Sequence, residues 1–248
     1  IGLFTDTYAP QVNGVSVSLQ MISEGLMKRG HQVTIFAPNF PGHKDSETNV
    51  MRLPSLKYLN NPPLYAAVLG TPRSTWKLTR KHFDVLHAHS PASVGLLAYL
   101  TASTKRLPLI YTYHTSITDY THYVKFIGGT SLIKQAAGWF SKASTNLGDQ
   151  VVVPSPKFHR LLLNQKVKQP ITVIPNGIDL SMFKSVKNPG ALRKRLGLSP
   201  DAQIMLTVGR MDPEKRLEFI VEAFDLLSER VPNVHLVFAG DGSARKSV

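Results

Sequence analysis

Short apolar runs alternate along the chain with stretches whose apolar residues recur at helical spacing. The runs at 1–5, 31–38, 85–90, 108–114, 150–155 and 171–176 have the length and residue types of buried strands. The patterns at about 14–29 and 93–104 predict helices, the first ending at Gly30, a residue common just after a helix. Strands that alternate with helices predict an α/β fold with a parallel sheet covered on both faces.

The same order of elements begins again near the C-terminus. Residues 204–210 and 235–240 resemble strands, with a predicted helix at about 214–230 between them. Residues 177–202, rich in Pro, Gly, Asn and Lys, predict a connector. We therefore expect two Rossmann-like domains, 1–176 and 203–248, joined by a linker at 177–202, with a ligand cleft between them. Because the chain starts inside one strand and stops soon after another, we expect a fragment whose second domain is truncated.

Composition and charge narrow the class of protein. The 248 residues include no cysteine, which excludes disulfides and thiolate metal sites and fits a reducing compartment. The chain contains no run of about 18 apolar residues, the length needed to span a bilayer, so we expect a cytoplasmic location. Residues 1–180 carry 18 Lys/Arg against 8 Asp/Glu, most of the net charge of +13, which favours an anionic partner surface. No nucleic-acid-binding motif accompanies this charge, so nucleic acid is not expected as a partner, and the oligomeric state is not predicted.

Two places combine a strand end with residues suited to phosphate. Asn13 and Gly14 stand where the first helix begins, and the amides of a helix start attract anions, although Asn-Gly is also an ordinary turn. The dinucleotide motif G-x-G-x-x-G is absent. In VGRMDPEKR, Arg210 ends a strand and Lys215 lies near the next helix start, a pair of cations suited to a diphosphate. Asp212 or Glu214 could instead pair with either cation.

Six landmarks occur in the order found in one known family. They are VNGV (12–15), HAHSP (87–91), His114 at a strand end, IPNGID (174–179), GR followed by EK (209–215) and GDG (240–242). With these residues the chain resembles the retaining glycosyltransferases of family 4, which have two Rossmann domains of the GT-B type. The acidic E-x7-E motif of that family has no match within these residues.

The resemblance implies transfer of a sugar from a nucleotide diphosphate sugar to a hydroxyl, with retention and without a cofactor or metal. Arg210 and Lys215 would stabilise the leaving diphosphate, and the Gly14 amide would add a donor. By the same resemblance His114 contacts the donor sugar. His89 either shapes the cleft or caps a helix, and Gly240 and Gly242 either approach the nucleotide or form a turn.

The acceptor is predicted from the segment after His114. Asp119 and Tyr120 belong to a loop, DYTHY, that is similar to bacterial enzymes that glucosylate diacylglycerol, so they are candidates for substrate binding. The aromatic residues Phe126, Trp139 and Phe140 that follow could enter a lipid boundary or pack in the protein. The expected acceptor is diacylglycerol or a related glycolipid, and the expected place is the inner face of the cell membrane.

A predicted helix over residues 71–83 points in the same direction. At helical spacing its cations share one arc beside two aromatic residues; the cations are Arg73, Lys77, Arg80 and Lys81, and the aromatic residues are Trp76 and Phe83. Such a helix could lie at a membrane interface, or cover the sheet with its aromatic residues inward. A soluble sugar or glycan acceptor, a sugar-nucleotide epimerase of the same fold, and a noncatalytic membrane-binding module remain alternatives.

Overall fold

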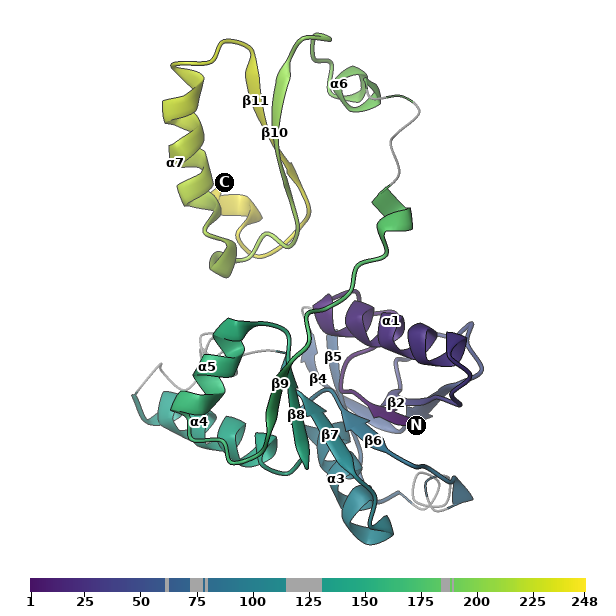
Figure 1. Ribbon diagram of the computed structural model, residues 1–248. Helices are drawn as coiled ribbons and strands as arrows, with labels where there is room; N and C mark the ends of the chain where they lie inside the picture. The colour runs from purple at the N-terminus through teal and green to yellow at the C-terminus, as the bar shows by residue number, and fades with distance from the viewer. Residues whose placement is uncertain (61–62, 72–77, 79, 115–130, 184–187, 189) are drawn as a thin grey trace. The chain divides into compact units, whose positions relative to one another are not determined.

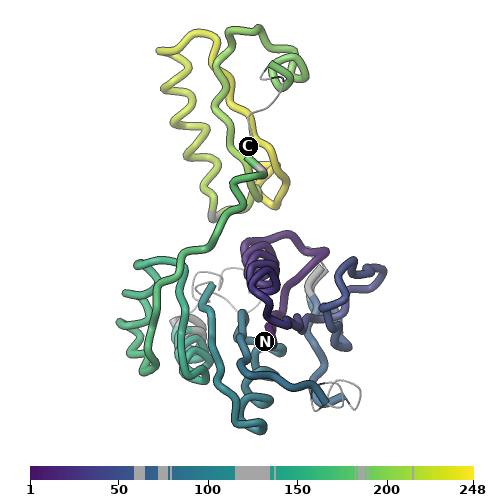
Figure 2. The backbone as a smooth tube through the Cα atoms, turned by 45° about the vertical axis from the view of Figure 1, so that its right-hand side comes forward, coloured from purple at the N-terminus to yellow at the C-terminus, as the bar shows by residue number. Residues whose placement is uncertain are grey.

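The computed structural model describes the chain except for residues 61–62, 72–77, 79, 115–130, 184–187 and 189 (Figure 1). These residues form two compact units, Ile1–Ile178 and Asp179–Val248, here called unit 1 and unit 2. The chain passes from unit 1 into unit 2 after residue 178 (Figure 2). The division falls inside the stretch that composition marks as a connector.

Unit 1 is built on one sheet in which every neighbouring pair of strands is parallel. The strands are β1 (Gly2–Phe4), β2 (Thr34–Pro38), β3 (Val50–Leu53), β6 (Leu86–Ala88), β7 (Leu109–Thr112), β8 (Gln150–Val153) and β9 (Ile171–Val173), in the order β3-β2-β1-β6-β7-β8-β9. Leu3 of β1 lies opposite Ile35 on one side and His87 on the other. The predicted α/β fold with a parallel sheet is confirmed. A reversal of strand order beside β1 places ligand-binding loops at the carboxyl ends of the central strands.

The helices of unit 1 cover both faces of this sheet. They are α1 (Gly14–Lys28), α3 (Ser93–Lys105), α4 (Ser131–Thr145) and α5 (Pro156–Asn164). Successive strand residues point to opposite faces, and both members of the pair Leu3 and Phe4 are fully buried. Leu3 packs in a cluster with Leu19 of α1, whereas Phe4 packs in a second cluster with residues of α3 and α5.

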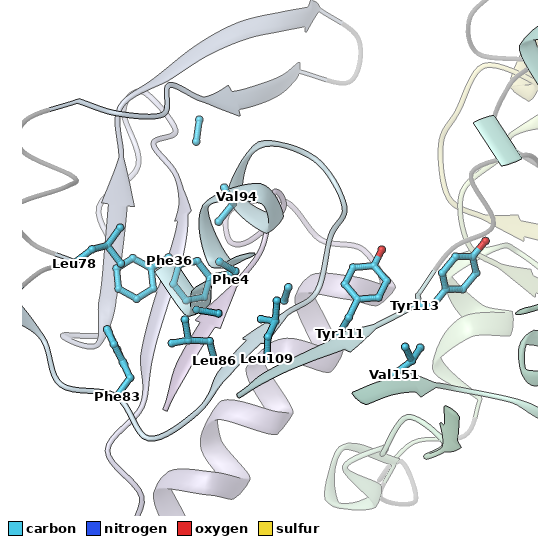
Figure 3. Packing of buried hydrophobic residues seen from close by; sticks show 14 of the residues in the cluster. Phe4, Phe36, Leu78, Phe83, Leu86, Val94, Leu109, Tyr111, Tyr113 and Val151 are labelled. Carbon is cyan, nitrogen blue, oxygen red and sulfur yellow. The ribbon is translucent and has the colours of Figure 1, made fainter. Parts of the chain in front are cut away.

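The larger cluster is centred on aromatic side chains (Figure 3). The rings of Phe4 and Phe36 stack with centroids 4.5 Å apart, and Phe83 meets Phe36 edge to face at 5.9 Å. Tyr111 and Tyr113 of the β7 region extend the cluster toward β8. Phe83 is therefore a core residue, which supports the inward one of the two orientations that the sequence left open for it.

Several elements were not predicted from the apolar pattern. They are β3, α5 and the antiparallel hairpin of β4 (Ser55–Asn60) and β5 (Pro63–Ala67), together with α4. In α4 the buried positions include Ser141, Ser144 and Thr145, while Trp139 and Phe140 are 72% and 42% exposed. At these positions small polar residues are buried and aromatic residues are exposed, so apolar spacing does not indicate the buried face of this part of the helix.

Unit 2 is a strand, helix and strand with a shorter helix before them. β10 (Gln203–Val208) and β11 (Val234–Ala239) pair in parallel, α7 (Leu217–Ser228) connects them, and α6 (Ala191–Arg195) precedes them. Three short 3-10 helices lie at Leu180–Phe183, Pro213–Lys215 and Arg245–Ser247. Met211, Leu217 and Ala244 form its small core with Ile220 and Phe238.

Candidate functional site

The loops after β1, β6 and β7 gather the polar residues of unit 1. These three strands are parallel neighbours, so Asp6, His89 and His114, which follow them, come to the same edge of the sheet. The sequence predicted His89 and His114 as two separate site candidates and did not predict a contact between them. The structure brings them together, because β6 and β7 are adjacent strands whose ends meet.

Three histidines are in contact at this edge. Nδ1 of His89 lies 2.9 Å from Nε2 of His114, a hydrogen-bond distance. The rings of His87 and His89 have centroids 4.0 Å apart, and Nε2 of His87 lies 2.6 Å from the hydroxyl of Thr112. His89 is 2% exposed, so it is a core residue that touches the more accessible His114. It therefore does not cap α3, which was one of its two predicted roles.

The three rings are neutral at physiological pH. Burial lowers the pKa of His114 to about 4. Burial, with a smaller contribution from His114, lowers the pKa of His87 to about 3. Burial and the neighbouring His87 and His114 lower the pKa of His89 well below its ordinary value. A neutral imidazole pair can hold one hydrogen bond between its rings without bringing a positive charge to this edge.

Asp6 joins the loop after β1 to the residues that follow β6, and it was not among the residues predicted from the sequence. Its carboxylate accepts hydrogen bonds from the hydroxyls of Ser90 and Ser93, both at 2.6 Å, and from the amide of Val94 at 2.9 Å. The N-cap residue of α3 is Ala92, which makes no side-chain cap bond, so Asp6 caps this helix from a distant part of the chain. The signal available in the sequence was an alanine at a helix start that needs an acceptor from elsewhere.

Asn13 and Gly14 have different roles at the start of α1. The Oδ1 of Asn13 accepts from the amides of Val15 and Ser16 at 3.0 Å, and its Nδ2 donates to Thr7 at 2.7 Å. Oδ1 of Asn13 thus caps the helix and its Nδ2 bonds the preceding loop, which favours the turn interpretation of this residue. Gly14 is exposed, and a Cβ added there would meet no atom of the protein. Packing gives no reason for glycine at this position, and the open space fits close approach of a ligand to the backbone.

Gly240 and Gly242 show the contrasting case. A Cβ on Gly240 would collide with the carbonyl oxygen of Gly209, and one on Gly242 would collide with that of Met211. The backbone after β11 therefore packs directly against the backbone after β10. This packing accounts for both glycines, so their predicted contact with a nucleotide stays a prediction.

Arg210, the first of the two predicted cations of unit 2, forms an ion pair. Arg210 Nη1 lies 2.7 Å from Asp212 Oδ2, so one of the acidic residues weighed as a partner does pair with it. The Asp212 carboxylate also accepts from the amide and hydroxyl of Ser243 at 3.1 Å. Arg210 remains 50% exposed. A carboxylate held in this way fixes the guanidinium group of Arg210 near the loop.

Lys215 does not lie in the first turn of α7. It ends the 3-10 turn Pro213–Lys215, and Arg216, at a φ of 50°, separates that turn from α7. Lys215 is exposed, and Arg216 lies over the ring of Phe219 at 5.2 Å. The predicted helix start at about 214 is therefore corrected to Leu217.

Several predicted residues lie outside the described part of the chain. These are Asp119 and Tyr120 of the acceptor loop, Phe126, and the residues Arg73, Trp76 and Lys77 of the predicted basic helix. Within the described part, no group of three or more His, Cys, Asp or Glu is arranged to hold a metal ion. No helix in this described part has the length and apolar character needed to cross a membrane.

Comparison with known proteins defines the class. Residues 12–182 match the family described as Glycosyltransferase Family 4, and residues 190–248 match Glycosyl transferases group 1. The chain belongs to Glycosyltransferase Family 4. It also resembles the solved structure of WaaG, a glycosyltransferase involved in lipopolysaccharide biosynthesis, with a TM-score of 0.63 and 16% identity, covering 100% of this chain and 65% of that one. This likeness in fold confirms the predicted GT-B type of α/β architecture.

Curated relatives differ in the sugar that their names give. The chain is 33% identical over 98% of its length to the alpha-monoglucosyldiacylglycerol synthase of Streptococcus pneumoniae and 31% identical over 98% to that of Acholeplasma laidlawii. It is 28% identical over 99% of its length to a GDP-mannose-dependent alpha-mannosyltransferase of Mycobacterium tuberculosis. The chain spans 56% of the first relative and 63% of each of the others.

Proposed function

We propose that the whole protein is a retaining glycosyltransferase that moves glucose, carried as UDP-glucose, to diacylglycerol or a related glycolipid. The observation that carries the proposal is the neutral histidine pair at the carboxyl edge of the sheet, within residues that match Glycosyltransferase Family 4. The two monoglucosyldiacylglycerol synthases among its relatives support the choice of sugar and acceptor. The place of action is the cytoplasmic side of the membrane.

The reaction breaks the bond between the anomeric carbon and the diphosphate oxygen. A bond to the acceptor oxygen forms on the same face of the sugar, and the acceptor proton passes to the leaving diphosphate. Negative charge grows on that diphosphate, where Arg210 and Lys215 supply positive charge and the amide of Gly14 a neutral donor. With cations in this role, the reaction needs no divalent metal and no cofactor.

His114 would hold the sugar rather than transfer a proton. The sugar becomes positively charged in the transition state, and a neutral ring beside it adds no repulsion. Burial keeps the pKa of His114 at about 4, so the ring stays neutral throughout the physiological range. Its hydrogen-bonding capacity is then available for a sugar hydroxyl or a nearby carbonyl oxygen.

The test is a product assay with the full-length protein. Panels of nucleotide sugars and of lipid and soluble acceptors should yield one glycosylated lipid by mass spectrometry, with its anomeric configuration read by NMR. A glycosylated soluble sugar would replace the lipid acceptor, and a free epimer formed without acceptor would replace transfer itself. Inversion of the anomeric centre would remove the retaining mechanism. If the protein consumes no nucleotide sugar, it is a noncatalytic membrane-binding module.

A lipid acceptor also requires contact with a membrane surface. The β4–β5 hairpin exposes Leu56 and Tyr58, at 68% and 65%, on either side of the exposed Lys57. Residues 48–83 contain six Lys/Arg and no Asp/Glu. Arg52 pairs with Asp45, but Lys57 is exposed between two exposed apolar side chains, an arrangement that suits a surface of anionic lipids.

Vesicle sedimentation tests this contact. Binding should be stronger to anionic than to neutral vesicles and should weaken with salt, because each basic residue near the surface contributes about 1 kcal/mol that salt screens. The double change Leu56→Ser with Tyr58→Ser should reduce binding. Leu163→Ser, at an exposed apolar position of α5, is the matched control. Equal binding to both vesicle types would remove the anionic surface as a partner and favour a soluble acceptor.

A further inference from the structure

His89 is bonded on one side of its ring only. Its Nδ1 lies 2.9 Å from Nε2 of His114, while its own Nε2 is buried without a hydrogen-bond partner in the described structure. Buried polar atoms without partners are rare, so this one calls for a reason. The proposed function uses His114 but gives no role to His89.

The unpaired Nε2 of His89 indicates which ring donates in the hydrogen bond between His89 and His114. In a neutral imidazole one nitrogen carries a proton and the other a lone pair. If His89 accepted at Nδ1, its buried Nε2 would carry an unpaired N–H. If it donates from Nδ1, its Nε2 is a bare acceptor, and unpaired buried acceptors are tolerated more often than unpaired buried N–H groups. Donation from His89 to His114 is therefore the favoured direction.

This direction selects the tautomer of His114. With its Nε2 accepting from His89, the proton of His114 resides on Nδ1. Among the described residues, none forms a hydrogen bond with that Nδ1. We propose that His89 is a positioning residue, which holds His114 as the Nδ1–H tautomer so that this N–H is ready to bond an oxygen of the donor sugar. The inference rests on the proposed function for the identity of the ligand, but not for the hydrogen bond.

The surroundings of His89 allow it to act as a fixed support. Its backbone amide donates to the carbonyl of Phe4 at 2.8 Å, and its ring lies against His87. The next residue, Ser90, is held by Asp6 through bonds of 2.9 and 2.6 Å. A donor anchored in this way orients His114 before any ligand binds, so no ordering is needed during the reaction.

NMR of the unliganded protein tests the tautomer directly. The full-length protein, labelled with ¹⁵N-histidine, should at pH 7 show a protonated Nδ1 and a bare Nε2 for His114. A protonated Nε2 on His114 would overturn the proposal. Because no substrate is present, this measurement is independent of the catalytic function.

Two amide variants test the positioning role. In His89→Asn the amide nitrogen occupies about the position of Nδ1, whereas in His89→Gln it occupies about that of Nε2. We expect His89→Asn to keep the His114 tautomer and kcat/KM for the sugar nucleotide within about twofold. We expect His89→Gln to lose the tautomer and about three- to tenfold in kcat/KM, as for one hydrogen bond.

The outcomes separate this proposal from the function on which it rests. Equal losses in both variants would show that His89 matters only as core volume, and unchanged kinetics in both would remove its positioning role. Either result leaves transfer activity established. If the wild-type protein transfers no sugar to any acceptor, the proposed function fails, while the ¹⁵N spectra still decide the direction of the bond.

Discussion

The histidines of unit 1 and the cations of unit 2 both follow parallel strands, but the protein treats them differently. His89 and His114 are withdrawn from water, held by each other and kept neutral, in a region with extensive aromatic packing. Arg210 and Lys215 are exposed and charged, on loops supported by a core of three buried residues. The neutral groups are thus preorganised by packing. The cations lie on loops, where Arg210 is held by its ion pair with Asp212 and both side chains remain exposed to solvent.

The largest effect is expected from removing a cation of unit 2. Arg210→Ala or Lys215→Ala in the full-length protein should lower kcat by about 10² or more, because each loses one charge that stabilises the leaving diphosphate. Thermal unfolding should change little. Arg230→Ala removes an exposed charge elsewhere in unit 2 and serves as the control. Turnover near that of the wild type would exclude the two cations from the mechanism.

The neutral histidines of unit 1 should make its stability depend on pH. The folded pKa of His114, about 4, lies below the ordinary value of 6.5, so between these pH values the unfolded chain binds a proton that the folded chain does not. The free energy of unfolding should therefore fall as pH falls through this window, by about 2 kcal/mol at pH 5 for this one ring. Urea unfolding at pH 7 and pH 5 measures the fall.

Variants assign this pH dependence to the buried ring. His114→Gln should show a smaller fall than the wild type, since one proton-binding group of the unfolded chain is gone. His82→Gln, which changes a ring exposed to water, is the matched control. If His114→Gln has the same pH dependence as the wild type, the ring is not kept neutral by the fold.

Glycines on the two units offer a sharper contrast. Gly240→Ala should destabilise unit 2 by about 1–3 kcal/mol, because its Cβ would collide with the carbonyl of Gly209. Gly14→Ala meets no atom and lies in a helix, so it should leave stability unchanged or raise it by up to about 1 kcal/mol. Thermal unfolding checks both. The affinity of the Gly14 variant for the donor should fall, and unchanged affinity would contradict ligand approach at this amide.

Chelation should have the smallest effect. If cations of the chain neutralise the diphosphate, transfer measured with EDTA should equal transfer measured with Mg²⁺ or Mn²⁺. Loss of activity in EDTA that a divalent ion restores would mean that the protein cations are insufficient. Such a result would mean that a metal ion, together with the cations of unit 2, neutralises the leaving diphosphate.

Local pattern was enough to predict most of the central strands and the two helices that flank them. Prediction from local pattern failed where polar side chains are buried or apolar side chains are exposed. In α4, Ser141 and Thr145 are buried while Trp139 is exposed, so among its described positions apolar character does not mark the buried face. For Phe83 the pattern left two orientations open, because a helical arc does not say which side meets the core.

Some residues of the candidate site could be predicted from local motifs, and others could not. Motifs along the chain pointed to His89, His114, Arg210 and Gly14, since strand ends and helix starts in a parallel α/β fold are recognisable from local residues. Motifs did not reveal Asp6, whose carboxylate caps a helix from more than 80 positions away. They also could not separate Gly14, which faces open space, from Gly240, which packs on another loop.

The sequence alone determined the α/β class, the family resemblance and the residue types available for chemistry, because periodicity and strand-end motifs are local. Only the tertiary structure decided that His89 meets His114, that both are neutral, and that Asp212 pairs with Arg210. The two histidines are neighbours because β6 and β7 are adjacent, and their neutrality follows from burial by residues distant in the chain. Charge state and pairing depend on what surrounds a side chain in space, and strand order and packing bring those surroundings together.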